Sequence, residues 1–212
     1  MFSPKVILWG GLAGLFSGMF WMMMGLAPSS GGATFVLALG LGLGGLVALY
    51  SGQAGQGGRL GSAGFALGII GTVLALAALG WGFTSGRFSP SNIQSEPIVA
   101  APGILIVSLA LVILGIGLAL LGLTSLQTKT LHRWRGLPLG VGLFSALSGI
   151  TFWLVYYVPL SQGRSPWVQW PPEGYFLNVA ALVLLGLGWM GLGITLANEA
   201  EAKAAQPPPA SA

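Results

Sequence analysis

The stretch that decides the fold is IVAAPGILIVSLALVILGIGLALLGL, residues 98–123, which contains no charged side chain. An α-helix rises 1.5 Å per residue, so a helix over this stretch exceeds the ~30 Å hydrocarbon core of a bilayer. An uncharged apolar run of this length is typical of a transmembrane helix.

Further apolar segments on both sides of this stretch are also long enough to span a bilayer and also lack Asp, Glu, Lys and Arg. They cover residues 6–27, 33–50, 60–83, 137–158 and 175–197. We therefore expect an all-α, polytopic integral membrane protein in which residues 1–198 form a bundle of six transmembrane helices. The final segment, EAEAKAAQPPPASA (residues 199–212), has the composition of a disordered tail.

The composition of the whole chain agrees with this class. Of the 212 residues, 54% are hydrophobic and only 6% are charged, whereas a soluble domain has about 25% charged residues. The chain has no cysteine, which excludes disulfides, thiolate-ligated iron–sulfur clusters and thiol nucleophiles. The few basic residues are scattered at segment ends and form no stripe, so we expect no nucleic-acid partner.

The distribution of basic residues predicts the orientation in the membrane. A six-span arrangement places Arg87 and Arg164 on one side of the bilayer. On the other side it places Lys5, Arg59, Lys129, Arg133, Arg135 and Lys203. By the positive-inside rule, both termini and the tail are cytoplasmic. The bilayer we expect is the inner (plasma) membrane of a bacterium, with a photosynthetic membrane as the open alternative.

The segment TKTLHRWRGLPLG, residues 128–140, holds the only histidine of the chain. We interpret His132, Arg133, Trp134 and Arg135 as anchors at the membrane interface, where basic side chains meet lipid phosphates and tryptophan lies at headgroup level. Catalytic zinc requires three protein ligands, and His132 has no cysteine or nearby carboxylate to join it. We therefore expect no metal site and no cofactor.

Glycines spaced four residues apart predict close packing of helices. They are Gly10, Gly14 and Gly18 in the first span, Gly40 and Gly44 in the second, and Gly64 and Gly68 in the third. Two interpretations stay open. The glycines pack helices within the monomer, or the first helix docks on another membrane subunit.

The outer loop YYVPLSQGRSPWVQWPPEGYF, residues 156–176, is rich in aromatic residues and proline. One interpretation is an aromatic belt at the membrane surface. The other is a ligand site in which Trp167, Trp170 and Glu173, with Asn178 just beyond the loop, bind a cationic or aromatic solute.

The layout resembles that of the substrate-binding components of energy-coupling-factor vitamin transporters, in its size, six spans and small-residue first helix. The resemblance implies a first helix that meets a transmembrane partner and outer loops that close over a solute. Ionisable residues inside the membrane mark pumps and many transporters, and the spans contain none; no hydrolase or kinase motif is present either. Our leading hypothesis is a non-enzymatic accessory or structural subunit, or scaffold, of a larger membrane complex. A solute-binding or transport subunit is the alternative.

Overall fold

The computed structural model describes residues 3–26, 31–53, 57–88, 97–129, 131, 134–164 and 172–205, without the side chains of residues 31, 97, 172–175 and 203. All regular elements in these ranges are helical, and none is a strand. The elements are α1 (Pro4–Leu26), α2 (Gly31–Gly52), α3 (Gly58–Thr84), α5 (Pro97–Thr128), α6 (Leu137–Phe152), the π-helix η2 (Trp153–Tyr157), α7 (Val158–Ser161) and α8 (Pro172–Ala204).

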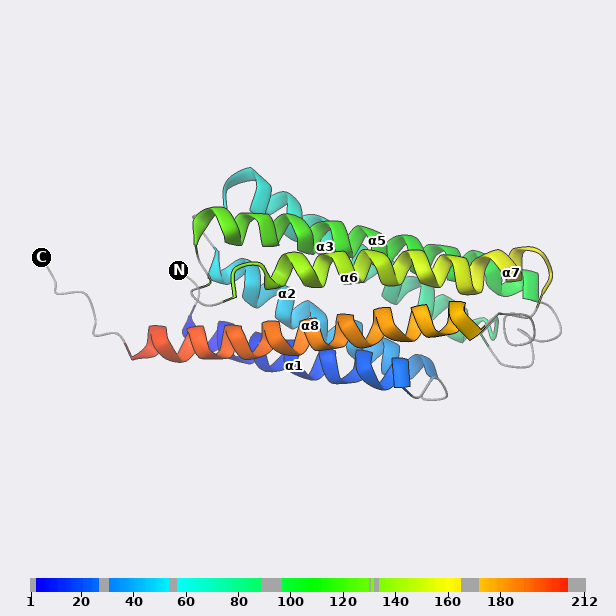
Figure 1. The fold of residues 1–212 in the computed structure, drawn as a ribbon, viewed down its shortest axis with the longest axis horizontal. Helices are drawn as coiled ribbons and strands as arrows, with labels where there is room; N and C mark the ends of the chain where they lie inside the picture. The colour runs from blue at the N-terminus through cyan, green and yellow to red at the C-terminus, as the bar shows by residue number, and fades with distance from the viewer. Residues whose placement is uncertain are drawn as a thin grey trace, which may run out of the picture.

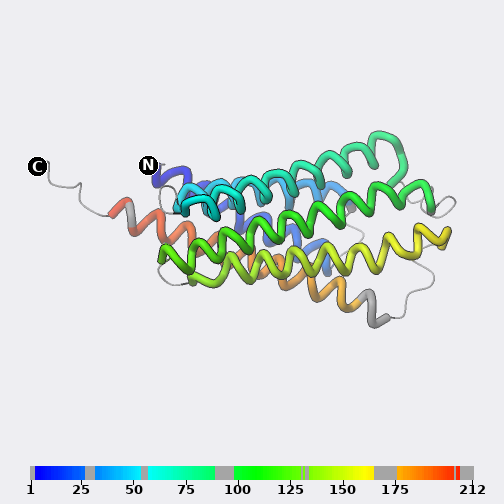
Figure 2. Tube along the Cα trace, turned by 90° about the horizontal axis from the view of Figure 1, so that it is seen from above, coloured from blue at the N-terminus to red at the C-terminus, as the bar shows by residue number. Residues whose placement is uncertain are grey.

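The prediction of six long apolar helices is confirmed, since six spans in the described residues are long and apolar enough to cross a membrane. α6, η2 and α7 together form the fifth of these spans. The spans run alternately up and down, so the start of α1 and the end of α8 lie at the same end of the bundle (Figures 1 and 2). We call this the termini end and the other the far end.

The helices form a closed ring. α1 packs on α2, α2 on α3, α3 on α5, α5 on α6 and α6 on α8, and α8 returns to pack on α1. Each neighbour in the ring is therefore also a neighbour in the chain, except where α8 meets α1. Short connections favour this arrangement, because they place consecutive helices side by side and antiparallel.

Four of the contacts in the ring are made through glycine. Between α1 and α8, a Cβ added at Gly18 would lie 2.7 Å from the backbone nitrogen of Met190, and one added at Gly11 would lie 2.9 Å from the carbonyl oxygen of Gly193. The other three contacts are equally close, at Gly10 with Gly44 (α1–α2), Gly64 with Gly117 (α3–α5) and Gly115 with Gly142 (α5–α6). Only glycine permits such an approach of two backbones.

The remaining two contacts, α2–α3 and α6–α8, are made through side chains. The space beside Gly68 on α3 is filled by the side chain of Leu46 on α2, and that beside Gly188 on α8 by the side chain of Val141 on α6. The bundle therefore consists of two glycine-packed units, the α1 unit (α2, α1 and α8) and the α5 unit (α3, α5 and α6). Side chains join one unit to the other.

The α1–α8 contact repeats every seven residues. Gly11, Gly18 and Gly25 of α1 face α8, and Gly186 and Gly193 of α8 face α1. A seven-residue repeat corresponds to 3.5 residues per turn, the geometry of left-handed coiled-coil packing. This contact is thus a coiled-coil seam in which glycine replaces the usual larger side chains.

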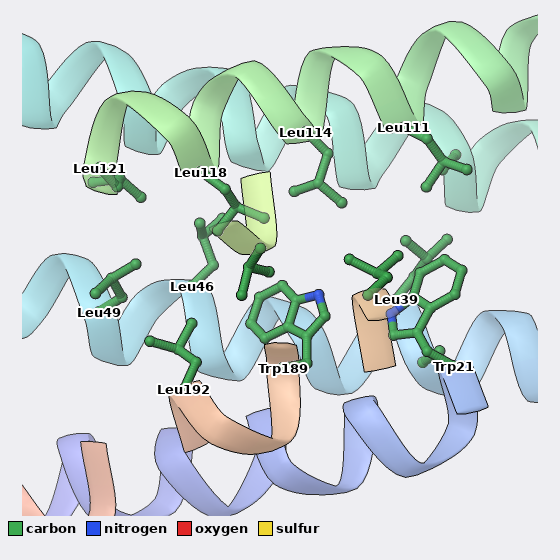
Figure 3. Close-up of a cluster of buried hydrophobic side chains, with 14 of the residues drawn as sticks. Trp21, Leu39, Leu46, Leu49, Leu111, Leu114, Leu118, Leu121, Trp189 and Leu192 are labelled. Atoms are coloured by element: carbon green, nitrogen blue, oxygen red, sulfur yellow. The ribbon is translucent and has the colours of Figure 1, made fainter. Parts of the chain in front are cut away.

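The core lies where the two units meet (Figure 3). Leu114 and Leu118 of α5 point toward Trp189 of α8 and Leu46 of α2. Each of these side chains is at most 4% exposed. The indole of Trp189 lies against the glycines of the α1–α2 contact, where a Cβ added at Gly45 would meet the ring at 2.7 Å. Small residues on α1 and α2 thus make room for one of the two buried tryptophans.

The fifth span contains a widened turn that the sequence analysis did not predict. In η2 the backbone N–H of Val158 donates to the carbonyl oxygen of Trp153, five residues earlier. Pro159 explains the widening, because it has no N–H to donate to Val155 and its ring would clash with that carbonyl in a regular α-helix. The span ends at Ser161, and Gly163, two residues later, has a φ of 71° that suits glycine.

The last helix is longer than the predicted span. α8 continues to Ala204, six residues into the segment expected to be a tail from residue 199. This continuation is rich in alanine and glutamate, which have high helix propensity. The proline-rich remainder, residues 206–212, lies outside the described residues.

Candidate functional site

The most polar interior contact at the far end joins α6 to α8. The side chain of Asn178 is 3% exposed, and its Oδ1 accepts a hydrogen bond from the hydroxyl of Thr151 at 3.3 Å. The same hydroxyl also lies 3.0 Å from the carbonyl oxygen of Ser148, as a second acceptor. Burying a carboxamide in an apolar interior is unfavourable unless it is hydrogen-bonded. This pair therefore fixes the α5 unit to the α1 unit near the far end.

A row of aromatic rings occupies the far half of the ring interior. Trp21 of α1 meets Phe35 of α2 edge-on at 5.1 Å between ring centroids. Phe35 meets Phe152 of α6 at 6.0 Å, and Phe152 meets Tyr156 of η2 at 4.5 Å. Edge-on and tilted pairs at these separations are favourable. The row crosses from one unit to the other, so it adds to the contact made by Asn178.

A matching polar contact lies at the termini end. Gln53, which follows α2, is 2% exposed. Its Nε2 donates to the carbonyl oxygen of Leu121 at 3.1 Å and to the hydroxyl of Ser125 at 2.5 Å, both on α5. Its Oε1 is buried without a hydrogen-bond partner in the described residues. The two units are thus joined by one polar contact near each end and by leucines between them.

Gln53 was not among the predicted site residues. It lies in the glycine-rich segment SGQAGQGGR, residues 51–59, where a solvent-exposed loop is the ordinary expectation. A signal was nevertheless present, because Ser125 follows the apolar core of the fourth span directly and is a suitable acceptor for an amide.

Of the four residues proposed to bind a solute, Asn178 is the one whose side chain is described. Trp167 and Trp170 lie outside the described residues. Glu173 lies in the first turn of α8, but its side chain is also outside them. Asn178 is described, and its carboxamide is directed between α6 and α8 toward Thr151.

The proposed interface anchors lie between α5 and α6. His132 and Arg133 are outside the described residues, while Trp134 is 59% exposed. Arg135 donates from Nε to the carbonyl oxygen of Leu131 at 3.2 Å. Leu131 itself is only 5% exposed.

Leu131 closes the centre of the ring at the termini end. It lines a small cavity of about 10 Å³ together with side chains from three helices. These are Ile7 of α1, Leu49 of α2, and Leu196 and Glu199 of α8. The basic segment therefore places one apolar side chain inward while Trp134 stays outside, a role that the sequence analysis did not predict.

The predicted packing glycines separate into different contacts. Gly10 and Gly44 lie at the α1–α2 contact, Gly14 faces both α2 and α8, Gly18 faces α8, Gly64 faces α5, and Gly68 faces Leu46. A Cβ added at Gly40 would meet no atom within 4 Å, so in the described chain Gly40 does not pack on another helix. The glycines of the first helix face helices of the same chain.

Within the described ranges, no group of three or more metal-ligating His, Asp or Glu side chains comes together. Comparison with known proteins gives no relative: no family model, curated protein or solved structure matches the chain significantly.

Proposed function

We propose that the protein is a non-enzymatic integral membrane protein, with both termini in the cytoplasm, that serves as an accessory or structural subunit of a larger membrane complex. One observation carries the proposal: large apolar side chains point outward from all six spans. Examples from five of them are Phe16, Leu37, Val73, Leu109 and Leu143, which are 48–60% exposed. An apolar surface this extensive is stable in lipid and would aggregate in water.

The filled interior supports a structural role. Leu118, Leu121 and Leu185 are each 0% exposed, and Trp189 occupies the space between the units at mid-height (Figure 3). A protein interior packed in this way holds its helices in one arrangement. Such a bundle suits a fixed subunit that presents its outer surface to partners.

The orientation can be tested by cysteine labelling, because the chain has no cysteine of its own. Gln127 at the termini end and Gln162 at the far end are both exposed glutamines. We expect a membrane-impermeant maleimide to label Gln162→Cys in intact cells and to label Gln127→Cys only after permeabilisation. The basic residues at the termini end favour this result.

The two variants control for each other, since both replace an exposed glutamine. Labelling of Gln127→Cys in intact cells, with protection of Gln162→Cys, would show that the orientation is opposite to the proposed one. Extraction of the protein by alkaline carbonate would contradict membrane insertion itself. Separation of cell membranes by density decides between the bacterial plasma membrane, which we expect, and a photosynthetic membrane.

The subunit role predicts stable association with other membrane proteins. We expect the full chain, solubilised in a mild detergent, to migrate on blue-native gels above the mass of its monomer, which is 21.7 kDa before bound detergent. Mass spectrometry of the excised band should identify the same partners in repeated purifications. Migration as a free monomer in every mild detergent would contradict the subunit role.

A second candidate, a solute-binding or transport subunit, is favoured by the buried carboxamide of Asn178 beside the aromatic row at the far end. This candidate predicts that a small cationic or aromatic molecule co-purifies with the protein and is lost in Asn178→Ala. If the Asn178→Ala variant retained the same molecule, this second candidate function would be wrong.

A further inference from the structure

We propose that the outward groove formed by α1, α2 and α3 binds one anionic phospholipid from the leaflet at the termini end. This inference rests on the membrane insertion proposed above. The groove has a volume of about 730 Å³, and its lining includes Lys5, Trp9, Ala13, Leu43, Val47 and Ile69.

The groove is a consequence of how the three helices pack. At the α1–α2 contact, Gly44 faces Ala13 so closely that an added Cβ would lie 2.8 Å from the Cβ of Ala13. Few side-chain atoms therefore stand above this contact. The α2–α3 contact is made through longer side chains. Ile69 of α3 therefore forms the wall of the groove opposite α1. The result is an apolar depression on a surface that faces lipid.

The length of the groove matches one leaflet. From Lys5 to Ala13, α1 rises about 12 Å at 1.5 Å per residue, which is somewhat less than half of a ~30 Å hydrocarbon core. An acyl chain that enters from the termini end fills such a groove. A partner transmembrane helix would need a contact surface along the whole thickness of the bilayer.

The charge at the groove mouth favours an anionic headgroup. Lys5 lies at the polar end of the groove, and Trp9, which is 70% exposed, lies one turn further in. A lysine near a helix end extends its ammonium group to the interface, and tryptophan prefers headgroup level. Basic residues at such a site attract lipid phosphates, and anionic lipids more than zwitterionic ones. Arg59 adds positive charge at the same end but does not line the groove.

The test is native mass spectrometry of the delipidated full-length protein, titrated with phosphatidylglycerol or phosphatidylethanolamine in detergent. We expect one tightly bound phosphatidylglycerol and weaker binding of phosphatidylethanolamine. Lys5→Glu should weaken phosphatidylglycerol binding by about tenfold. Arg59→Glu, the same change of charge at the same end, should leave it within about twofold of the wild type.

A second pair of variants tests the apolar part of the site. Val47→Trp fills the groove and should abolish the bound lipid, whereas Val36→Trp, on the same helix but outside the groove, should not. Equal effects of Lys5→Glu and Arg59→Glu, equal binding of both lipids, or full binding by Val47→Trp would each overturn the proposal. If the wild type forms a dimer that Val47→Trp dissociates, the groove binds a second copy of the chain, and the lipid proposal is wrong. If the wild type resists carbonate extraction but binds no phosphatidylglycerol, the lipid site fails while membrane insertion stands.

Discussion

Adding one methyl group at Gly18 is expected to destabilise the bundle by about 1–3 kcal/mol, the usual cost of overpacking a tight interior. In Gly18→Ala the new Cβ would lie 2.6 Å from Cγ and 2.7 Å from the backbone nitrogen of Met190. The Met190 side chain can rotate away, but the backbone nitrogen moves only if α8 moves away from α1. The measurement is SDS-induced unfolding in mixed micelles, followed by circular dichroism.

Gly40→Ala is the matched control, because Gly40 is also a helical glycine with a small residue four positions away. A Cβ at Gly40 would meet no atom within 4 Å. Replacing a helical glycine by alanine at an unobstructed position favours the helix by about 0.5–1 kcal/mol. We therefore expect Gly40→Ala to equal or exceed the wild type in stability. Equal destabilisation by both variants would contradict the close α1–α8 contact.

Gly18 and Gly40 also differ in a way that the sequence alone does not predict. Gly18 and Gly40 belong to the same four-residue pattern, and the pattern alone predicts that both pack on another helix. Which face of α2 is covered depends on where α1 and α3 lie, and this is decided by the whole ring. The seven-residue spacing of Gly11, Gly18 and Gly25 is present in the sequence and marks the α1–α8 contact. The four-residue spacing of Gly10, Gly14 and Gly18 overlaps with it, so the sequence did not show which of the two spacings marks a helix contact.

The six spans themselves were predictable, because length and the absence of charge suffice to identify each helix. Local departures within the spans were harder to predict. Pro159 indicates a disturbance of the fifth span, but a kink, a break and a π-turn are all compatible with a proline near the end of a helix. In the structure, the backbone of Trp153–Tyr157 forms the π-turn.

The polar contacts between the α1 and α5 units depend on tertiary structure and could not be derived from spacing. Gln53 and Ser125 are 72 positions apart in the chain, and Thr151 and Asn178 are 27 apart. The first pair forms because the end of α2 reaches α5, which is not its neighbour in the ring, and the second because α6 and α8 are neighbours. The sequence analysis placed Asn178 in a candidate solute site. An uncharged amide inside an apolar span needs a partner, but spacing alone does not identify Thr151 as that partner.

Removing the indole of Trp189 is expected to have the largest effect of any single truncation in the core. Trp189 is 2% exposed and fills the space between the glycines of α1–α2 and the leucines of α5 (Figure 3). Trp189→Ala leaves a cavity that rigid, glycine-packed helices cannot close, so we expect a loss of about 3–5 kcal/mol. The same mixed-micelle unfolding experiment measures it.

Two further variants separate the contribution of ring volume from that of the indole N–H. Trp134→Ala, at a position 59% exposed, should change stability by no more than about 0.5 kcal/mol. Trp189→Phe keeps most of the ring and removes Nε1, which is buried without a hydrogen-bond partner in the described residues. Loss of an unpaired buried donor is favourable, so it offsets part of the lost volume, and we expect Trp189→Phe to lie much closer to the wild type than Trp189→Ala. If Trp189→Phe were as damaging as Trp189→Ala, the N–H would have to bind an acceptor that this arrangement of helices does not supply, and the central role of ring packing would be wrong.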